Sequence, residues 1–177
     1  MSLDTLREQL PDYAKDIKLN LGNLASDESL DQQKKWGTFL SCAIAGRNPD
    51  VIRAIGAEAK NHLSDDAFRA AKAAAGIMAM NNVYYRFGHE AGNEVYKTLP
   101  AKLRMTIIGN PGVEKTDFEL WALAVSSING CFMCVDSHEA IVRKGGLSTE
   151  QVQTAVRIAA VVQAASTIVG AETALAE

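Results

Sequence analysis

The sequence predicts an all-α fold, and three observations support this. Apolar residues recur at intervals of three and four through nearly every segment, which is the spacing of one helix face. Alanine is abundant, and no stretch alternates strictly between apolar and polar residues as a half-buried strand does. The 177 residues, 47% hydrophobic and 22% charged, can bury a core and do not fit a disordered or fibrous protein. We therefore expect a single helical domain over residues 1–177.

Two helices are expected before the first strong break. The first follows Pro11 and has an apolar face made of Ile17, Leu21 and Leu24. The second covers about residues 30–45 and ends at Gly46, because glycine readily takes the backbone conformation that closes a helix.

Two further helices begin at recognisable N-caps. Asn48 places a capping side chain directly before Pro49 at the first helical position, and this helix should reach about Leu63. Ser64 then caps a helix that continues to about Asn81.

The second half opens with an irregular region. Residues 96–100 lack a clear period, and the Asn-Pro-Gly run at residues 110–112 interrupts any helix. Thr116, with Glu119 three residues later, forms a capping-box pattern that predicts a helix start.

That helix should end or kink at Asn129 and Gly130. A new helix then carries residues 131–144 and stops at the two glycines of positions 145–146. Ser148 and Gln151 form a second capping box, and the final helix runs nearly to the C-terminus. A CxxC motif therefore lies at the start of a helix in the second half.

Residues 36–81 and 121–166 resemble each other, each beginning at a tryptophan, Trp36 or Trp121, that we expect to be buried. A long unit used twice indicates a duplicated helical bundle with two similar halves rather than a solenoid. The halves differ at the chemically interesting positions: Cys131, Cys134 and His138 correspond to Gly46, Pro49 and Arg53. Only the second half is therefore expected to be active.

Charge and cysteine content narrow the function classes. Eighteen Lys and Arg against 21 Asp and Glu give a net charge of −3 without a basic block, which argues against nucleic acid as a partner. The longest uncharged run is shorter than a membrane-spanning helix needs to be. Because the acidic N-terminus also does not resemble a secretory signal, we expect a cytoplasmic protein. Three cysteines do not make a disulfide framework, and a close pair in a reducing compartment indicates redox chemistry or a metal.

Cys131, Cys134 and His138 should share one helix face. At about 100° per residue, Cys134 lies about 60° and His138 about 20° from Cys131. The i and i+4 spacing brings the imidazole of His138 near Cys134, where it can take the thiol proton directly or through a water. A helix start also favours an anion, and would expose Cys131 more than Cys134.

A peroxide would oxidise the thiolate to a sulfenic acid, which the second cysteine can condense into a disulfide. Zinc is a weaker interpretation, because a closed site needs four ligands and the nearest candidates, Asp136 and Glu139, point to other faces. No metal is therefore expected. A thioredoxin-like role is also weakened, since that motif follows a strand.

Other candidates have plainer interpretations. From its position alone, Glu119 is better explained by helix capping than by chemistry. Cys42 lies in an apolar helix and is expected to be inert packing. His62 and His89 are expected at the surface or in turns. A group of side chains could line a hydroperoxide channel but is better explained by helix packing: Met78, Met80, Tyr84 and Tyr85.

The segment from Asp117 to Lys144, DFELWALAVSSINGCFMCVDSHEAIVRK, is similar to the motif of the alkylhydroperoxidase D family, which is related to carboxymuconolactone decarboxylase. Likeness extends over most of the chain, including PDYAKDIKLNL, IMAMNNVYYRF and NPGVEKTDFELW. The resemblance implies a helical subunit, usually in a homotrimer, that reduces organic hydroperoxides with no bound cofactor. Its reductant would be dihydrolipoamide on the lipoylated acyltransferase of a 2-oxo acid dehydrogenase complex, and a peroxiredoxin is a further partner.

Carried over by position, the resemblance makes Cys134 the thiol oxidised by peroxide and Cys131 its disulfide partner. Glu119 and His138 become a proton relay. Met133 departs from the pattern, because a known relative carries His there, which puts the rate or the reductant contact in doubt. Two alternatives remain: a carboxymuconolactone decarboxylase-like lyase that uses Glu119 and His138 without redox chemistry, and a non-catalytic thiol redox sensor.

Overall fold

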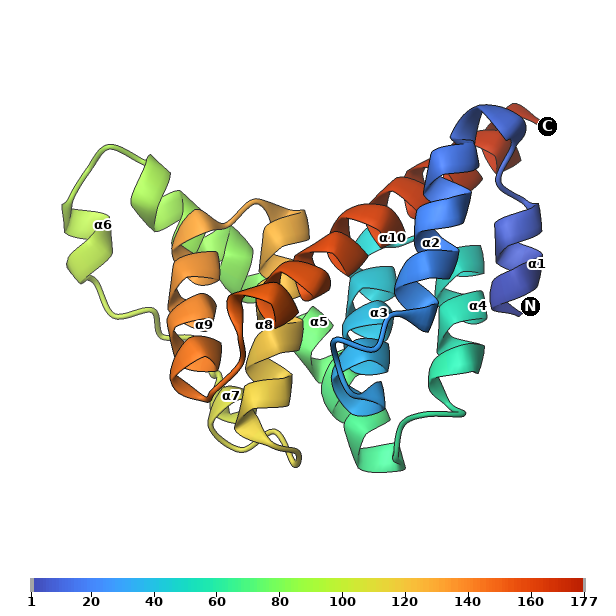
Figure 1. Cartoon of the computed structure of the whole chain (residues 1–177). Coiled ribbons are helices and arrows are strands. Elements are labelled where there is room, and N and C mark those ends of the chain that lie inside the picture. The colour runs from blue at the N-terminus through green and yellow to red at the C-terminus, as the bar shows by residue number, and fades with distance from the viewer. Residues whose placement is uncertain (1, 177) are drawn as a thin grey trace.

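The computed structural model describes residues 2–176, and within them it contains helices and no strand (Figure 1). The α-helices are α1 (Leu3–Glu8), α2 (Lys15–Ser26), α3 (Gln32–Gly46), α4 (Pro49–Ala59), α5 (Asp65–Glu90), α6 (Val95–Thr98), α7 (Thr106–Gly109), α8 (Lys115–Asn129), α9 (Phe132–Lys144) and α10 (Thr149–Leu175). A 3₁₀ turn covers Asp12–Ala14. The all-α prediction is confirmed.

Helices α3 and α8 form the centre of the molecule, and α5 and α10 pack across them. In Figure 1, α10 runs from the middle of the molecule toward the side that carries α1, α2 and both chain ends. The two tryptophans are buried as expected, and the Trp121 ring lies directly against α3. A Cβ atom at Gly37 would come within 2.1 Å of that ring, so only glycine fits there. The Trp121 Nε1–H donates to the backbone oxygen of Lys34 at 3.1 Å.

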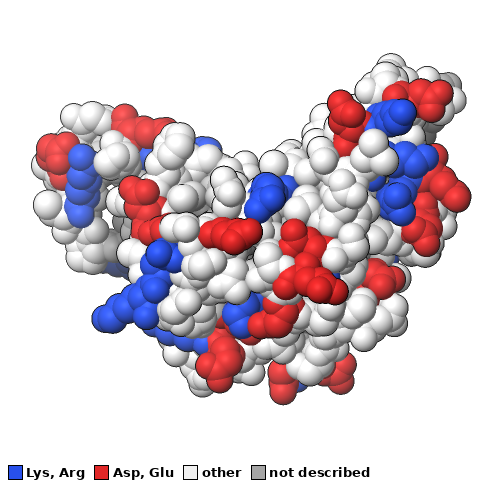
Figure 2. Space-filling model, in the orientation of Figure 1, with Lys and Arg blue, Asp and Glu red and all other residues white. Residues whose placement is uncertain are grey.

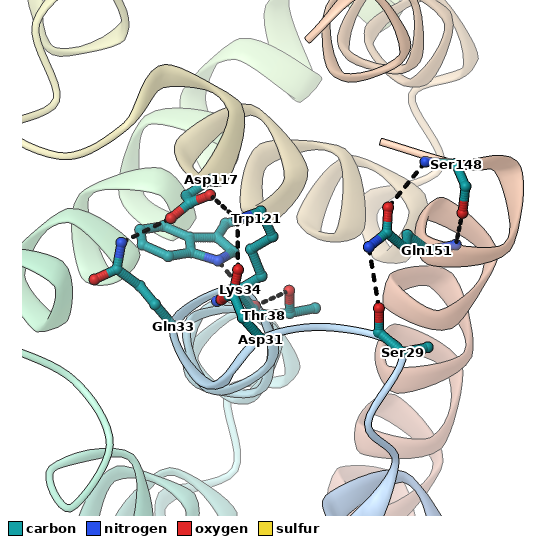
Figure 3. A network of polar contacts seen from close by, with 9 residues as sticks. All are labelled: Ser29, Asp31, Gln33, Lys34, Thr38, Asp117, Trp121, Ser148 and Gln151. Carbon is teal, nitrogen blue, oxygen red and sulfur yellow. Dashed lines mark hydrogen bonds and ion pairs between the residues drawn. The ribbon is translucent and has the colours of Figure 1, made fainter. Parts of the chain in front are cut away.

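A buried polar network fixes the first turn of α8 to α3 (Figure 3). Asp117, only 2% exposed, lies 3.0 Å from the Nζ of Lys34 and accepts a hydrogen bond of 2.7 Å from the Nε2 of Gln33. Lys34 also pairs with Asp31 at 2.6 Å. Burial lowers the pKa of Lys34, but its bonds to the two aspartates outweigh burial and the net shift is upward. The paired charges therefore hold the first turn of α8 against α3.

The predicted order of helices recurs in both halves. A helix that contains a buried tryptophan, a shorter helix and a long helix follow one another as α3, α4 and α5, and again as α8, α9 and α10. The caps predicted at Asn48, Ser64 and Ser148 are present, and Ser148 and Gln151 form the expected capping box. Duplication itself stays a prediction.

Four boundaries differ from expectation. Helix α5 continues to Glu90, nine residues beyond Asn81, while α4 stops at Ala59 and the short α1 was not predicted. The capping box at Thr116 is wrong: α8 already begins at Lys115, and the side chain before it makes no capping bond. Instead the backbone oxygen of Glu114 receives the first-turn bonds, from the N–H groups of Asp117 and Phe118. Glu119 is therefore free for another role.

Two surface properties bear on partners and location. Figure 2 shows acidic and basic side chains interspersed over the visible face, without a continuous basic area. Helix α10 is long and apolar enough to cross a membrane by length and composition alone. It packs against α2, α3 and α8, and a core helix passes the same test, so this is weak evidence for a span.

Candidate active site

Two residues, Gly130 and Cys131, connect α8 to α9. Gly130 closes α8 with φ = +69°, a left-handed conformation that glycine adopts without strain, and its N–H bonds back to the oxygens of Ser126 and Ser127. Cys131 follows as the residue that precedes α9, and its N–H bonds to the oxygen of Ser126 at 3.1 Å. The predicted break at Gly130 is confirmed, and α9 folds back beside α8.

The two cysteines form a disulfide across this turn. Cys131 lies outside the helix and Cys134 in its first turn, with their Cα atoms 5.3 Å apart. Cys131 is 1% exposed and Cys134 7%, so the expectation that a helix start exposes Cys131 more is wrong. The reason is that the tight turn at Gly130 folds Cys131 inward against α8. The better exposed sulfur belongs to Cys134.

His138 and Glu119 are brought together from separate helices. The Nδ1 of His138 lies 2.6 Å from the Oε2 of Glu119, whose side chain is 1% exposed. The capping explanation of Glu119 is therefore incorrect, because its carboxylate points at the imidazole from the middle of α8. A buried carboxylate beside one ring nitrogen fixes the orientation of the imidazole ring.

The other ring nitrogen of His138 contacts a thioether. Its Nε2 lies 3.2 Å from the Sδ of Met78 on α5. Since a thioether sulfur has no proton to give, a hydrogen bond here requires the hydrogen on Nε2. The imidazole of His138 therefore contacts Glu119 through Nδ1 and Met78 through Nε2.

These groups line one cavity of about 330 Å³ between α5, α8 and α9. Cys134, His138 and Glu119 face it, whereas Cys131 does not line it. The rest of the wall is mainly apolar or neutral: Met78, Asn81, Tyr85, Met105, Ile108, Met133, Ser137 and Ile141. Met78 and Tyr85 therefore contribute to a cavity wall, and Met78 is also packed in a buried hydrophobic cluster, as the packing interpretation expects.

A second cavity of about 300 Å³ adjoins the first. The two share Tyr85 and Met133 in their walls, and the second is otherwise formed by the end of α5 and the segment around α6. Tyr84 and His89 line this second cavity, while Met80 lines neither of the two. Met133 therefore lies where the two spaces meet.

The remaining candidates lie away from the site. Cys42 is fully buried in the core, and burial raises the pKa of its thiol. His62 stacks on Trp36 at the surface, with ring centroids 4.8 Å apart. Asp136 is exposed and Glu139 pairs with Arg143, so neither is directed at the cysteines. Within residues 2–176 no group of three His, Cys, Asp or Glu side chains is arranged to hold a metal.

Sequence reasoning did not anticipate five residues of the wall: Asn81, Met105, Ile108, Ser137 and Ile141. Asn81 was expected at the end of its helix, and a signal did exist: it lies three residues after Met78 and four before Tyr85, on the same face of an extended α5. Met105 lies in the irregular region before α7, where no period indicates a direction.

Comparison with known proteins assigns the chain to a family. The model of the carboxymuconolactone decarboxylase family matches residues 94–177. An alkyl hydroperoxide reductase AhpD from Maricaulis maris is 62% identical over 172 residues, which cover 97% of this chain and 99% of the relative. Proteins of the same name from Gluconacetobacter diazotrophicus and Hyphomonas neptunium are 63% and 58% identical, covering 97% and 99% of this chain and 94% and 98% of their own lengths. The chain therefore belongs to the AhpD family of alkyl hydroperoxide reductases, within the carboxymuconolactone decarboxylase group.

Proposed function

We propose that the protein reduces organic hydroperoxides through a dithiol–disulfide cycle of Cys131 and Cys134. The observation that carries this proposal is the placing of Cys134 with the His138–Glu119 pair on the wall of one mainly apolar cavity. An apolar cavity accommodates the organic part of the substrate, while the buried pair supplies a base beside the thiol.

The first half of the cycle consumes the peroxide. His138 takes the proton of the Cys134 thiol, and Glu119 stabilises the resulting imidazolium. The Cys134 thiolate attacks the terminal oxygen, so that an S–O bond forms, the O–O bond breaks, and the alkoxide leaves as alcohol after taking a proton from His138. Cys131 then attacks the sulfenic acid, water leaves, and the disulfide closes.

The second half of the cycle requires a dithiol. We propose dihydrolipoamide carried by an acyltransferase, which reopens the disulfide by exchange and leaves as oxidised lipoamide. The adjoining cavity supports this, because it meets the first at Tyr85 and Met133 and offers an aromatic wall to a slender chain. A peroxiredoxin that receives electrons from this protein is the alternative partner.

A homotrimer is proposed as the assembly. Large apolar side chains are exposed on the half of the molecule that carries the site, namely Val83, Phe87, Val95, Leu99 and Phe132. Exposed apolar surface of this kind commonly forms a protein–protein interface. Light scattering on the purified protein tests the proposal, with a mass of three chains expected.

Two single variants test the cycle. Cys134→Ser should abolish hydroperoxide consumption. Cys131→Ser should consume about one equivalent and stop, leaving a sulfenic acid on Cys134 that dimedone labels. Sustained turnover by Cys131→Ser with a lipoyl dithiol would overturn the disulfide step.

The acid–base lyase is the second candidate, because the matching family model carries that name. It would need Glu119 and His138 but neither thiol. Alkylation of both thiols separates the two functions, since it should end peroxidase activity and spare a lyase.

A further inference from the structure

Asn81 lies in the wall of the Cys134 cavity, and its side-chain amide oxygen has no partner of its own. Asn81 lines that cavity and is 4% exposed. Its Oδ1 is buried and has no hydrogen-bond partner among residues 2–176. Buried amide groups in proteins are nearly always hydrogen-bonded, so an unpaired one in a cavity points to a ligand.

The next residue, Asn82, shows how an asparagine in this turn of α5 stabilises the fold. The Nδ2 of Asn82 donates to the Oγ of Ser126 at 2.9 Å, and its Oδ1 accepts from the Nδ2 of Asn129 at 2.9 Å. Both bonds hold α5 against α8. Asn81 makes neither, although it lies in the same turn of α5, so stability does not account for it.

Asn81 is also well positioned relative to the reacting groups. It lies three residues after Met78, whose sulfur contacts the Nε2 of His138, and four residues before Tyr85. The other polar side chains of the wall are already used or lie at its outer edge. Glu119 and His138 bond each other, the Tyr85 hydroxyl donates to the Sδ of Met105 at 3.7 Å, and Ser137 is exposed.

We propose that Asn81 binds the peroxide group of the substrate, an inference that rests on the proposed function. A hydroperoxide has one O–H donor and two acceptor oxygens, and a primary amide offers a donor and an acceptor side by side. The amide oxygen accepts the terminal O–H, and the amide N–H donates to the oxygen that carries the organic group.

This contact strengthens during the reaction. As the Cys134 sulfur bonds to the terminal oxygen, the O–O electron pair passes to the leaving oxygen. The Asn81 N–H stabilises that negative charge until His138 delivers a proton and the alcohol leaves. Cys134 is oxidised to the sulfenic acid and the hydroperoxide is reduced. Asn81 is thus a catalytic residue that changes no protonation state.

Single-turnover kinetics with two oxidants test the proposal. Disulfide formation in the reduced protein is followed with cumene hydroperoxide and, separately, with diamide, which oxidises dithiols without an O–O bond. Asn81→Ala should react about 10²-fold more slowly with cumene hydroperoxide, the effect typical of losing one charge-stabilising donor. Its rate with diamide should stay within about two-fold of the wild type.

Asn81→Asp provides a second variant if alanine prevents folding. It keeps the shape of the side chain but replaces the N–H donor by an acceptor, so it should be slowed at least as much with the hydroperoxide. Because an amide does not titrate, Asn81→Ala should lower the rate by the same factor at every pH. His138 variants, in contrast, should change the shape of the pH profile.

Each other outcome is decisive. Equal slowing with both oxidants would mean that Asn81 supports the thiols structurally, and no slowing with either would mean that it does not touch the substrate; both overturn the inference. If the wild type reacts with diamide but not with cumene hydroperoxide, the proposed function itself fails. If the wild type reacts with cumene hydroperoxide and Asn81→Ala is slowed with that oxidant alone, both the inference and the proposed function are supported.

Discussion

The Nδ1 of His138 lies 2.6 Å from the Oε2 of Glu119, although the two residues belong to different helices and are 19 positions apart in the sequence. The turn at Gly130 and Cys131 folds α9 back along α8 and makes this contact. Cys134 lines the cavity that both residues face. The carboxylate, the imidazole and the thiol thus lie on the wall of one cavity, and we predict that they act as one unit.

Glu119→Gln tests that unit. Glutamine keeps the shape of the side chain but lacks the charge that stabilises the imidazolium, so kcat/KM for cumene hydroperoxide should fall about 10²-fold. His138→Asn should cost a similar factor. The double variant should be little slower than either single one, because residues that act together are not additive. If the rate losses of the two single variants multiply in the double variant, the proton relay of Glu119 and His138 is contradicted.

Gly37→Ala tests the contact between α3 and α8. The new Cβ would come 2.1 Å from the Trp121 ring, and such overpacking costs about 1–3 kcal/mol of unfolding free energy in urea. Gly76 on α5 is the matched control, since a Cβ there meets nothing within 4 Å. Gly76→Ala should stabilise by about 0.5–1 kcal/mol through helix propensity. Equal effects of the two changes would count against the close helix contact.

Removing Lys34 should lower the free energy of unfolding, because the charge of Asp117 is then buried without its partner. Lys34→Met leaves Asp117, 2% exposed, with Gln33 as its remaining side-chain partner, and should destabilise the protein by about 2–4 kcal/mol. Lys34→Met with Asp117→Asn should recover part of the loss. Urea unfolding of the wild type and the two variants measures this, and no recovery would argue against a paired charge.

The pH dependence of the Lys34–Asp31 pair follows from its pKa shifts. The pKa of Lys34 is raised above its ordinary value of 10.5, so its stabilisation is complete below that pH and is lost as the pH rises through the raised value. The pKa of Asp31 is lowered below 3.8, because the Lys34 bonds outweigh the opposing effect of burial, and its contribution disappears in acid. The stability difference between wild type and Lys34→Met should be flat near neutral pH and should narrow at both extremes. A difference that changes around pH 7 would contradict this assignment.

Cys42 should not react in the folded protein. It is fully buried, and burial raises the pKa of its thiol, which leaves almost no thiolate to be alkylated. Iodoacetamide should therefore label Cys134 in the reduced native protein well before Cys42, as read by peptide mass spectrometry. Labelling of both at similar rates would show that the core opens easily.

Local patterns predicted most of the helices, the break at Gly130 and the placing of Cys134 and His138 on one face of α9. They failed at Glu119, where a capping-box spacing was present but α8 begins at Lys115 and the carboxylate bonds His138, 19 positions away. They also missed Asn81, because α5 runs nine residues beyond its expected end and its last turns form the cavity wall. Contacts between distant segments decided both cases.

A thiol count in denaturant, before and after one equivalent of cumene hydroperoxide, tests the central claim most directly. The chain has three cysteines, so the reduced protein should show three thiols per chain and the treated protein one, that of Cys42. Cys134→Ser should start with two thiols and keep both. Three thiols remaining in the treated wild type would contradict the peroxide-driven Cys131–Cys134 disulfide.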